Sequence, residues 1–339
     1  MEWILAVPGL AWPDAHDGAE VSKGLSTPAL SLLLGRGARA ACPGRPSRLW
    51  RDLFGIDRLA PARLAARQDG LDADAGHWLI ADPVHVRVDR DRALLADVGV
   101  MALSGEEAGS LVAALGRHFA ADGLSFHVGK PGRWYVQSAH PFDAEFSALT
   151  DAIGEDIDEH LPTGANGLAW CRFLNEAQML LHSHPVNETR EARGDLPVNS
   201  LWLWGEGDVP AERTSFDLVL SDDATVRLLC EAAAVPVDDL PFGFAAAEDR
   251  AGEAGRVTRC LAVPDAAEAP AQFRDAWGWR EALEKLEADW FEPALLALKS
   301  GRIDALTLRT AGAAGVSVRV TRADLWKLWR RPLALPQLY

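Results

Sequence analysis

The chain has 339 residues, of which 48% are hydrophobic and 24% are charged, and its formal net charge is −15. This composition excludes disorder as the main state, because the apolar content offsets the entropy lost on ordering. The acidic balance argues against a sequence-independent nucleic-acid binder, which needs a basic surface. The four cysteines (Cys42, Cys171, Cys230 and Cys260) are far apart in the chain. We therefore expect reduced, buried thiols in a cytoplasmic protein.

Short apolar runs bounded by turn residues alternate with amphipathic segments, which predicts a mostly parallel sheet flanked by helices. The first run, 3–7, follows an acid and no basic segment, so we expect a strand there and not a signal peptide. Further strands are expected at 200–204, 216–220, 258–263, 303–309 and 316–320. Their nearly continuous apolar character suits strands that are covered on both faces. No run reaches the ~20 apolar residues that span a bilayer.

Helices are predicted at about 104–121, 165–181 and 277–299. Ser104 and Glu107 have the spacing of a capping box, and Pro293 should kink or split the last helix. Five cations lie in 319–331 beside two tryptophans. We expect this segment to form an amphipathic helix that packs Leu325, Trp326, Leu328 and Trp329 on the core, with a nucleic-acid or partner patch as the alternative.

Residues 77–162 have a different pattern. Apolar and polar residues alternate at 84–88, 124–128 and 133–137, as they do in half-buried antiparallel strands. The predicted helix at 104–121 lies between these strands. We therefore expect a discontinuous α/β core of residues 1–76 and 163–339, with an α+β subdomain of residues 77–162 inserted into it.

The densest polar grouping runs from Asn175 to Gly207. Pro185 can begin a helix, so that Asn187 and Arg190 lie one helical turn apart and can point the same way. An apolar strand follows and ends in a glycine-flanked turn, 204–207. In open α/β sheets, ligands bind beyond the carboxyl ends of strands. This grouping is therefore the candidate site.

Two interpretations of this grouping remain open. In the first, it binds an anion or metabolite, because the planar arginine fork suits carboxylate and phosphate. The residues proposed for that site are Arg133, His184, Asn187, Arg190, Asn199, Trp204, Gly205 and Gly207. In the second interpretation, the asparagines and the histidine cap helices or satisfy buried backbone groups, and Arg190 pairs with Glu188 or Glu191.

The run His-Pro-Val-Asn-x-x-Arg from His184, followed by Asn-Ser-Leu-Trp-Leu-Trp-Gly-x-Gly from Asn199, resembles the archaeal-type cofactor-independent phosphoglycerate mutase family. Further pieces at 82–87, 132–135, 161–164 and 175–181 resemble more closely the bacterial RpfE-type regulatory proteins, which look like a divergent branch of that family. The resemblance implies an alkaline-phosphatase-like fold. It also implies two divalent metals, held by Asp and His, that activate a Ser or Thr to take up a phosphoryl group.

The residues for that chemistry depart from the family's pattern. The Asp-Gly that ends the first strand in the mutases corresponds here to Pro8-Gly9, and proline has no ligand atom. All nine histidines lie at or before His184, so the late strands cannot supply one. Four acids are weak candidates for a site that could hold Mg or Mn, and otherwise are loop acids or helix caps. They are Asp14, Asp222, Asp223 and Asp265.

These observations favour a regulatory pseudoenzyme of the RpfE type that binds a small phosphorylated or carboxylated metabolite, or a protein partner. We expect no cofactor, no nucleic acid and no membrane among its partners. The alternative is a metal-dependent phosphoglycerate mutase or phosphatase-type phosphotransferase with a rebuilt Mn or Mg site.

Overall fold

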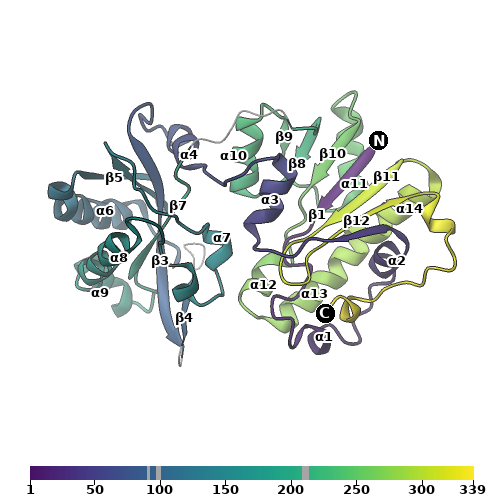
Figure 1. The fold of residues 1–339 in the computed structure, drawn as a ribbon, viewed down its shortest axis with the longest axis horizontal. Helices are drawn as coiled ribbons and strands as arrows, with labels where there is room; N and C mark the ends of the chain where they lie inside the picture. The colour runs from purple at the N-terminus through teal and green to yellow at the C-terminus, as the bar shows by residue number, and fades with distance from the viewer. Residues whose placement is uncertain (90–91, 97–100, 208–213) are drawn as a thin grey trace. The chain divides into compact units, whose positions relative to one another are not determined.

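The computed structural model describes the chain from residue 1 to 339 except for residues 90–91, 97–100 and 208–213 (Figure 1). The chain forms two compact units. The first consists of Met1–Asp57 and Pro210–Tyr339, and the second of Arg58–Val209.

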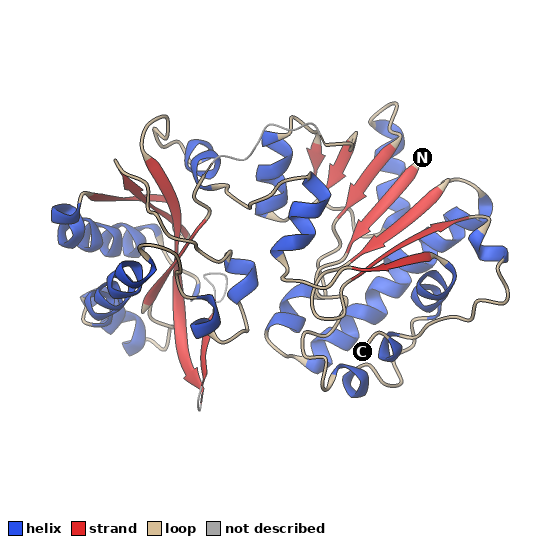
Figure 2. Cartoon of the chain, in the orientation of Figure 1, coloured by secondary structure: helices blue, strands red, loops and turns tan. Residues whose placement is uncertain are grey.

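The first unit is built on a seven-stranded sheet of order β2-β12-β11-β1-β10-β8-β9 (Figure 2). The five strands from β11 to β9 in this order pair in parallel. β12 pairs antiparallel with β11, and β2 pairs antiparallel with β12. The strands are β1 (Glu2–Ala6), β2 (Ala38–Ala41), β8 (Leu218–Leu220), β9 (Val237–Asp238), β10 (Arg259–Ala262), β11 (Ala305–Arg309) and β12 (Val316–Thr321). Nearly every residue of β1, β8 and β10 is buried, which explains their continuous apolar runs.

The helices of the first unit include one that changes its geometry before a proline. They are α1 (Gly18–Val21), α2 (Pro28–Arg36), α3 (Ser47–Phe54), α10 (Ala224–Ala232), α11 (Phe244–Glu253), α12 (Glu268–Gln272), α13 (Ala276–Leu286) and α14 (Glu292–Ser300), with 3-10 turns η4 (Asp324–Trp326) and η5 (Leu335–Gln337). Between α13 and α14 the chain makes a π-helical turn, η3 (Glu287–Phe291), immediately before Pro293. The predicted kink or split at Pro293 therefore takes the form of a π-helical turn within one continuous helical segment. Proline lacks the N–H that a regular α-helix would use.

The second unit contains a five-stranded antiparallel sheet of order β4-β3-β6-β5, with β7 paired to β3. The strands are β3 (His77–Asp89), β4 (Arg92–Ala96), β5 (Leu124–Lys130), β6 (Arg133–Ser138) and β7 (Ser200–Trp204). The helices are α4 (Ala62–Gln68), α6 (Gly105–Phe119), α7 (Leu149–Ala152), α8 (Gly167–His182) and α9 (Pro185–Ala192), with 3-10 turns η1 (Ala120–Asp122) and η2 (Ile157–His160). The predicted capping box is confirmed at the start of α6, where Ser104 and Glu107 bond reciprocally.

The strand at 200–204 corrects the sequence-based topology. We expected it in the parallel sheet of the core, but β7 pairs antiparallel with residues 80–84 of β3. Its residues from Leu201 to Trp204 are all buried, and an apolar run that is buried on both faces has the same pattern in either kind of sheet. Together with α8 and α9, β7 joins the unit that contains residues 77–162. That unit therefore begins earlier and ends later than the predicted insertion.

The segment after β12 is a second correction. The predicted amphipathic helix is wrong, because the chain makes only the short turn η4 and then an irregular loop. Leu325 is buried as expected, whereas Trp326, Leu328 and Trp329 are exposed. Two features explain the short turn. The Asp324 carboxylate bonds back to Thr321, and Pro332 cannot continue a helix.

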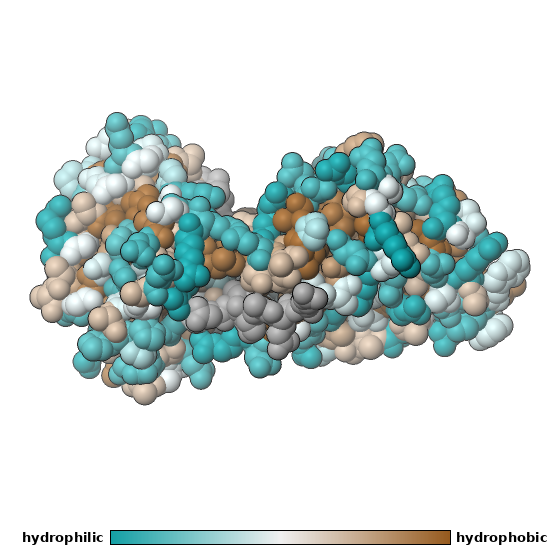
Figure 3. Space-filling model, turned by 90° about the horizontal axis from the view of Figure 1, so that it is seen from above, coloured by the Kyte–Doolittle hydropathy of each residue, from teal (hydrophilic) through white to brown (hydrophobic). Residues whose placement is uncertain are grey.

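All four thiols are free, and Cys230 and Cys260 are buried while the other two are half-buried. Within the described ranges, none of the helices combines the length and the apolar character that crossing a bilayer requires. On the face that Figure 3 shows, hydrophilic side chains predominate and hydrophobic ones form smaller patches.

Candidate functional site

Asn187, the central residue of the predicted site, is saturated by backbone partners. Its Nδ2 donates to the carbonyl oxygens of Leu181 and Val198, both at 2.7 Å. Its Oδ1 accepts the Val198 N–H at 2.9 Å. The side chain is 1% exposed. Asn187 therefore fastens the end of α8 to the loop that enters β7.

Arg190 is fully buried, with 0% exposure. Its Nη1 lies 2.9 Å from a carboxylate oxygen of Glu107 on α6, and its Nε donates to the Leu196 carbonyl at 2.9 Å. A third bond goes to the carbonyl of Met101. The partner is thus Glu107, and not Glu188 or Glu191 as the structural interpretation of the sequence expected.

The Glu107 carboxylate is shared between two arginines. Arg193, which is half exposed, also pairs with it. Burial alone would raise the pKa of Glu107, but hydrogen bonds from Ser104 and Arg193 and the charge of Arg190 lower it below its ordinary value. Since the Arg190 guanidinium bonds three separate segments of the second unit, its role in the structure is to hold them together.

The other polar residues of the motif also bond inside the second unit. His184 caps α9, with its Nδ1 accepting the Val186 N–H at 3.2 Å, and partial burial and then Arg117 lower the pKa of His184. Asn199 pairs with both backbone groups of Val86, at 2.7 and 2.8 Å. These contacts fit the structural interpretation of the motif.

Two further predicted residues have carboxylate partners that the sequence did not reveal. Trp204 Nε1 donates to Asp82 at 2.7 Å. Arg133 forms a two-pronged pair with Asp69, at 2.8 and 2.6 Å, and the Tyr135 hydroxyl donates to the same carboxylate at 2.7 Å. Burial alone would raise the pKa of Asp69, but the bonds from Arg133 and Tyr135 lower it. No sequence motif marks Asp69, which lies 64 residues from Arg133.

The last two predicted residues, Gly205 and Gly207, lie in the turn after β7 with φ of +83° and +118°. A side chain at position 205 would come within 3.1 Å of the Pro61 ring, and together with the positive φ this close contact favours glycine. Gly207, in contrast, lines a cavity, although a side chain there would come within 3.1 Å of the Ala60 side chain. Of the eight predicted residues, this glycine therefore leads to the candidate site.

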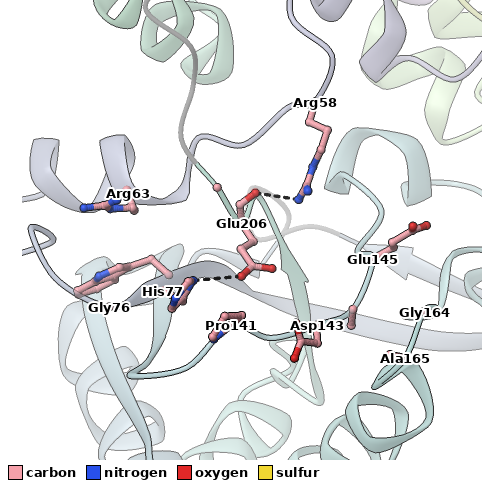
Figure 4. Close-up of a pocket in the computed structure, with 13 residues that line it drawn as sticks. Arg58, Arg63, Gly76, His77, Pro141, Asp143, Glu145, Gly164, Ala165 and Glu206 are labelled. Carbon is pink, nitrogen blue, oxygen red and sulfur yellow. Dashed lines mark hydrogen bonds and ion pairs between the residues drawn. The ribbon is translucent and has the colours of Figure 1, made fainter.

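A cavity of about 480 Å³ lies within the second unit, beside this turn (Figure 4). Such a volume is typical of small-molecule sites, which run from roughly 300 to 1,000 Å³. Its polar walls come from five segments of the unit. The charged or titratable residues among the lining are Arg58, Arg63, His77, Asp143, Glu145 and Glu206.

Glu206 is the centre of this cavity. Figure 4 shows it between His77 and Arg58. Its carboxylate lies 3.5 Å from His77 Nδ1 and accepts the Phe142 N–H at 3.4 Å, while its carbonyl accepts from Arg58 Nη2 at 3.1 Å. One residue therefore joins three distant segments around the cavity. The only sequence signal for it was an acid between two glycines.

Arg58 supplies an unneutralised charge to this cavity. Its guanidinium bonds a carbonyl oxygen, and in the part of the chain that the structure describes no carboxylate pairs with it. Arg63 donates to two more carbonyls, those of Ala73 and Asp74, at 3.2 and 2.9 Å. Positive charge at one wall and the Asp143 and Glu145 carboxylates at another can bind an anionic ligand that also carries hydroxyl groups.

The first unit has its own small cavity at the carboxyl edge of its sheet, where the resemblance places metals. Its volume is about 70 Å³. The lining is mainly apolar, with Pro8, Leu49 and Trp50, and it includes Glu268 and Gln272. Burial, and then the charges of Asp223 and Asp265, raise the pKa of Glu268 to about 8.

Asp222, Asp223 and Glu268 near this edge already have partners. Asp223 caps α10 through the Val226 N–H at 2.7 Å, Asp222 accepts the Leu240 N–H at 3.1 Å, and Gln272 donates to Glu268 at 3.3 Å. Asp14 is exposed and accepts the His16 N–H. Among the described residues, no group of three or more His, Cys, Asp or Glu is arranged to hold a metal. The donor set therefore does not fit a two-metal centre.

No family model matches the chain. The chain is 29% identical over 143 residues to the 2,3-bisphosphoglycerate-independent phosphoglycerate mutase of Methanosarcina mazei, which covers 41% of this chain and 36% of that protein. It is 28% identical over 172 residues to the protein of the same name from Methanosarcina acetivorans, covering 49% and 43%. The chain is a distant relative of these mutases. It matches less than half of their length.

The structural similarity to a solved protein covers more of the chain than the sequence similarity does. The PH0037 protein from Pyrococcus horikoshii matches 94% of this chain, over 87% of its own, with a TM-score of 0.53 at 14% identity. The predicted class is confirmed: an alkaline-phosphatase-like α/β fold with a mostly parallel sheet flanked by helices. Likeness at this level of identity shows the fold and leaves the activity to be inferred from the site.

Proposed function

We propose that the chain is a cytoplasmic regulatory relative of the cofactor-independent phosphoglycerate mutases, of the RpfE type, that binds a small anionic metabolite without converting it. The observation that carries this proposal is the cavity of the second unit, where Arg58 has no carboxylate partner among the residues that the structure describes. The resemblance of 82–87, 132–135 and 175–181 to RpfE-type proteins supports the regulatory role.

The chemistry of the cavity indicates the class of ligand. A guanidinium that is not paired with a carboxylate can bind two oxygens of a phosphate or carboxylate at once. Asp143, Glu145 and Glu206 can accept hydrogen bonds from hydroxyl groups on the rest of the ligand. We therefore infer a phosphorylated or carboxylated metabolite that carries at least one hydroxyl group.

The proposal that the ligand is not converted rests on the residues at the carboxyl edge of the first unit. Pro8 stands at the end of β1, and no histidine follows His184. A metal at this edge would depend on Asp222, Asp223 and Asp265, and the first two already accept backbone N–H groups. The rival function is a phosphotransferase that uses these acids with Mn or Mg.

A thermal-shift screen tests the binding proposal. The probes are inorganic phosphate, 2- and 3-phosphoglycerate, other sugar phosphates and hydroxy acids. A ligand at about a hundred times its Kd stabilises the folded state by about 2.7 kcal/mol. We expect at least one probe to raise the unfolding temperature of the wild type, and Arg58→Ala to abolish that rise.

Arg67→Ala is the matched control, because Arg67 is exposed on α4, pairs with Asp74 at 2.9 Å and is absent from the cavity lining. The control should respond to the probes like the wild type. Stabilisation that persists in Arg58→Ala would contradict the proposed site. If no probe stabilises the wild type, the binding proposal fails as well.

Elemental analysis together with an activity assay separates the proposal from its rival. We expect the purified protein to contain no stoichiometric Mn, Mg or Zn, and to show no mutase or phosphatase turnover when Mn or Mg is added. Stoichiometric metal with turnover, lost in Asp223→Asn, would establish the phosphotransferase instead.

A further inference from the structure

The loop after β12, residues 322–333, presents three large apolar side chains to solvent. Trp326 is 73% exposed, Leu328 is 69% exposed and Trp329 is 77% exposed. These three residues lie within four positions of the chain, so their exposed side chains all project from one short segment. We call this segment the tryptophan loop. Contiguous apolar exposure of this kind marks an interaction site.

The tryptophan loop is held in place at both ends. The Asp324 carboxylate accepts from the Thr321 N–H at 2.8 Å, and Leu325 is buried in the core. On the far side, Arg330 Nη1 donates to the Gly37 carbonyl at 2.9 Å, and the Leu333 N–H donates to Ser31 at 2.8 Å. These contacts fix the loop in a conformation that keeps the tryptophans outside the core, so binding there costs little additional ordering.

The backbone of the loop is largely satisfied from within. The N–H groups of Trp326, Lys327, Leu328 and Arg330 donate to carbonyls of the same segment at 2.8 to 3.2 Å. In an apolar medium, each unsatisfied backbone group costs several kcal/mol. A loop with internal bonds can therefore enter a less polar surrounding than a loop that depends on water.

The charge of the loop opposes that of the rest of the chain. Residues 322–331 contain four cations and one acid, a local balance of +3 in a chain of −15. The acid, Asp324, is already paired with Lys327. Arg322 and Arg331 are exposed, and neither forms a hydrogen bond or ion pair with any residue that the structure describes. Two free guanidinium groups therefore flank the apolar patch.

We propose that the tryptophan loop docks on the surface of an anionic lipid bilayer. Trp326, Leu328 and Trp329 enter the headgroup boundary, and Arg322 and Arg331 pair with lipid phosphates. Tryptophan is enriched at that boundary, and apolar side chains beside basic residues are typical of segments that lie in it. The expectation of no membrane partner rested on apolar run length, which does not bear on a peripheral contact through one loop.

Other occupants fit the loop less well. Leu328, between the tryptophans, has no ring to stack on a base, which disfavours a nucleic acid. In a symmetric dimer formed through this loop, two segments that each carry a net charge of +3 would face each other and repel. The acidic remainder of the chain is repelled by an anionic surface, so that only this face approaches it.

Vesicle flotation tests the proposal with the full chain. The probes are vesicles of phosphatidylcholine alone and vesicles with an equimolar share of phosphatidylglycerol. We expect binding to the anionic vesicles only, and at least tenfold weaker binding for the double variant Trp326→Ala, Trp329→Ala. Arg331→Glu should weaken binding by at least about fivefold, the effect of one basic residue near such a surface. Trp277→Ala is the matched control, because Trp277 is 85% exposed on α13, outside the loop.

The substituted residues are exposed, so the variants should unfold at the wild-type temperature, and Leu328→Asn provides a second variant of the patch. The proposal is overturned if the anionic vesicles do not bind the chain, or if the double variant binds them as well as the wild type does. Sedimentation velocity tests the alternative in which a second copy of the chain occupies the tryptophan loop. A dimer that dissociates in the double variant would assign the patch to a second copy of the chain and would likewise overturn the proposal.

Discussion

Replacing Arg190 by methionine tests whether this residue holds the second unit together or binds a ligand. Arg190→Met keeps most of the side-chain volume and removes the guanidinium. The Glu107 carboxylate then loses its buried partner, and the carbonyls of Leu196 and Met101 lose their donors. Breaking a buried ion pair by removing one partner costs about 3 to 5 kcal/mol. We expect a loss of that size in the free energy of unfolding of the second unit.

The assay is urea unfolding followed by hydrogen exchange at the amides of β3 and β6, which report on the second unit separately from the first. Arg193→Met is the matched control, because Arg193 pairs with the same Glu107 carboxylate but its side chain is 49% exposed. An exposed pair contributes about 0 to 1 kcal/mol. The control should therefore be nearly as stable as the wild type.

One result would refute the reasoning. If the unfolding free energy of Arg190→Met lies within about 1 kcal/mol of the wild-type value, the buried pair of Arg190 and Glu107 contributes no more than an exposed pair does. If the same variant also loses stabilisation by a metabolite, Arg190 is the ligand residue that the motif suggested.

Two further predictions concern pH. The folded-state pKa of Asp69 is lowered by Arg133, so the stability it contributes is complete above the unfolded-state pKa of ~3.9 and is lost as the pH falls through the folded-state value. Asp69→Asn should therefore flatten the decline of unfolding free energy below about pH 4, and an unchanged decline would contradict the pairing. Burial raises the pKa of Glu268 to about 8, so stability should fall as the pH rises from about 4.5 to that value. Glu268→Gln should be more stable than the wild type at pH 8 by about 2 kcal/mol. This value is smaller than the full pKa shift would give, because the side chain is partly exposed. Equal stability of the two proteins at pH 8 would count against the burial of this carboxyl.

The sequence correctly predicted the features that depend on residues close together in the chain. The capping box at Ser104 and Glu107 and the helix irregularity before Pro293 depend on neighbours a few residues away, and both are present. The strand at 200–204 was found as a strand but placed in the wrong sheet. Its burial comes from partners more than a hundred residues away along the chain, in β3. Sequence pattern alone does not identify such a partner.

The candidate site shows the same limit. The motif at 184–190 is rich in groups that bind ligands, yet Asn187 and Arg190 bond to the protein itself, and Glu107 lies 83 residues from Arg190. The cavity depends on Arg58 and Glu206, which lie 148 residues apart. Only the folded chain brings the Arg58 guanidinium, which pairs with no carboxylate among the described residues, to the same cavity as Glu206. The terminal loop was misassigned for a related reason, because exposed tryptophans have the same spacing as packed ones.

The most direct test of the account is a crystal structure of the protein with whichever metabolite stabilises it most. We expect density for the compound in the cavity of the second unit, with an anionic group within hydrogen-bonding distance of Arg58. Density at the carboxyl edge of the first sheet, beside Glu268 and Asp265, would contradict the proposed site.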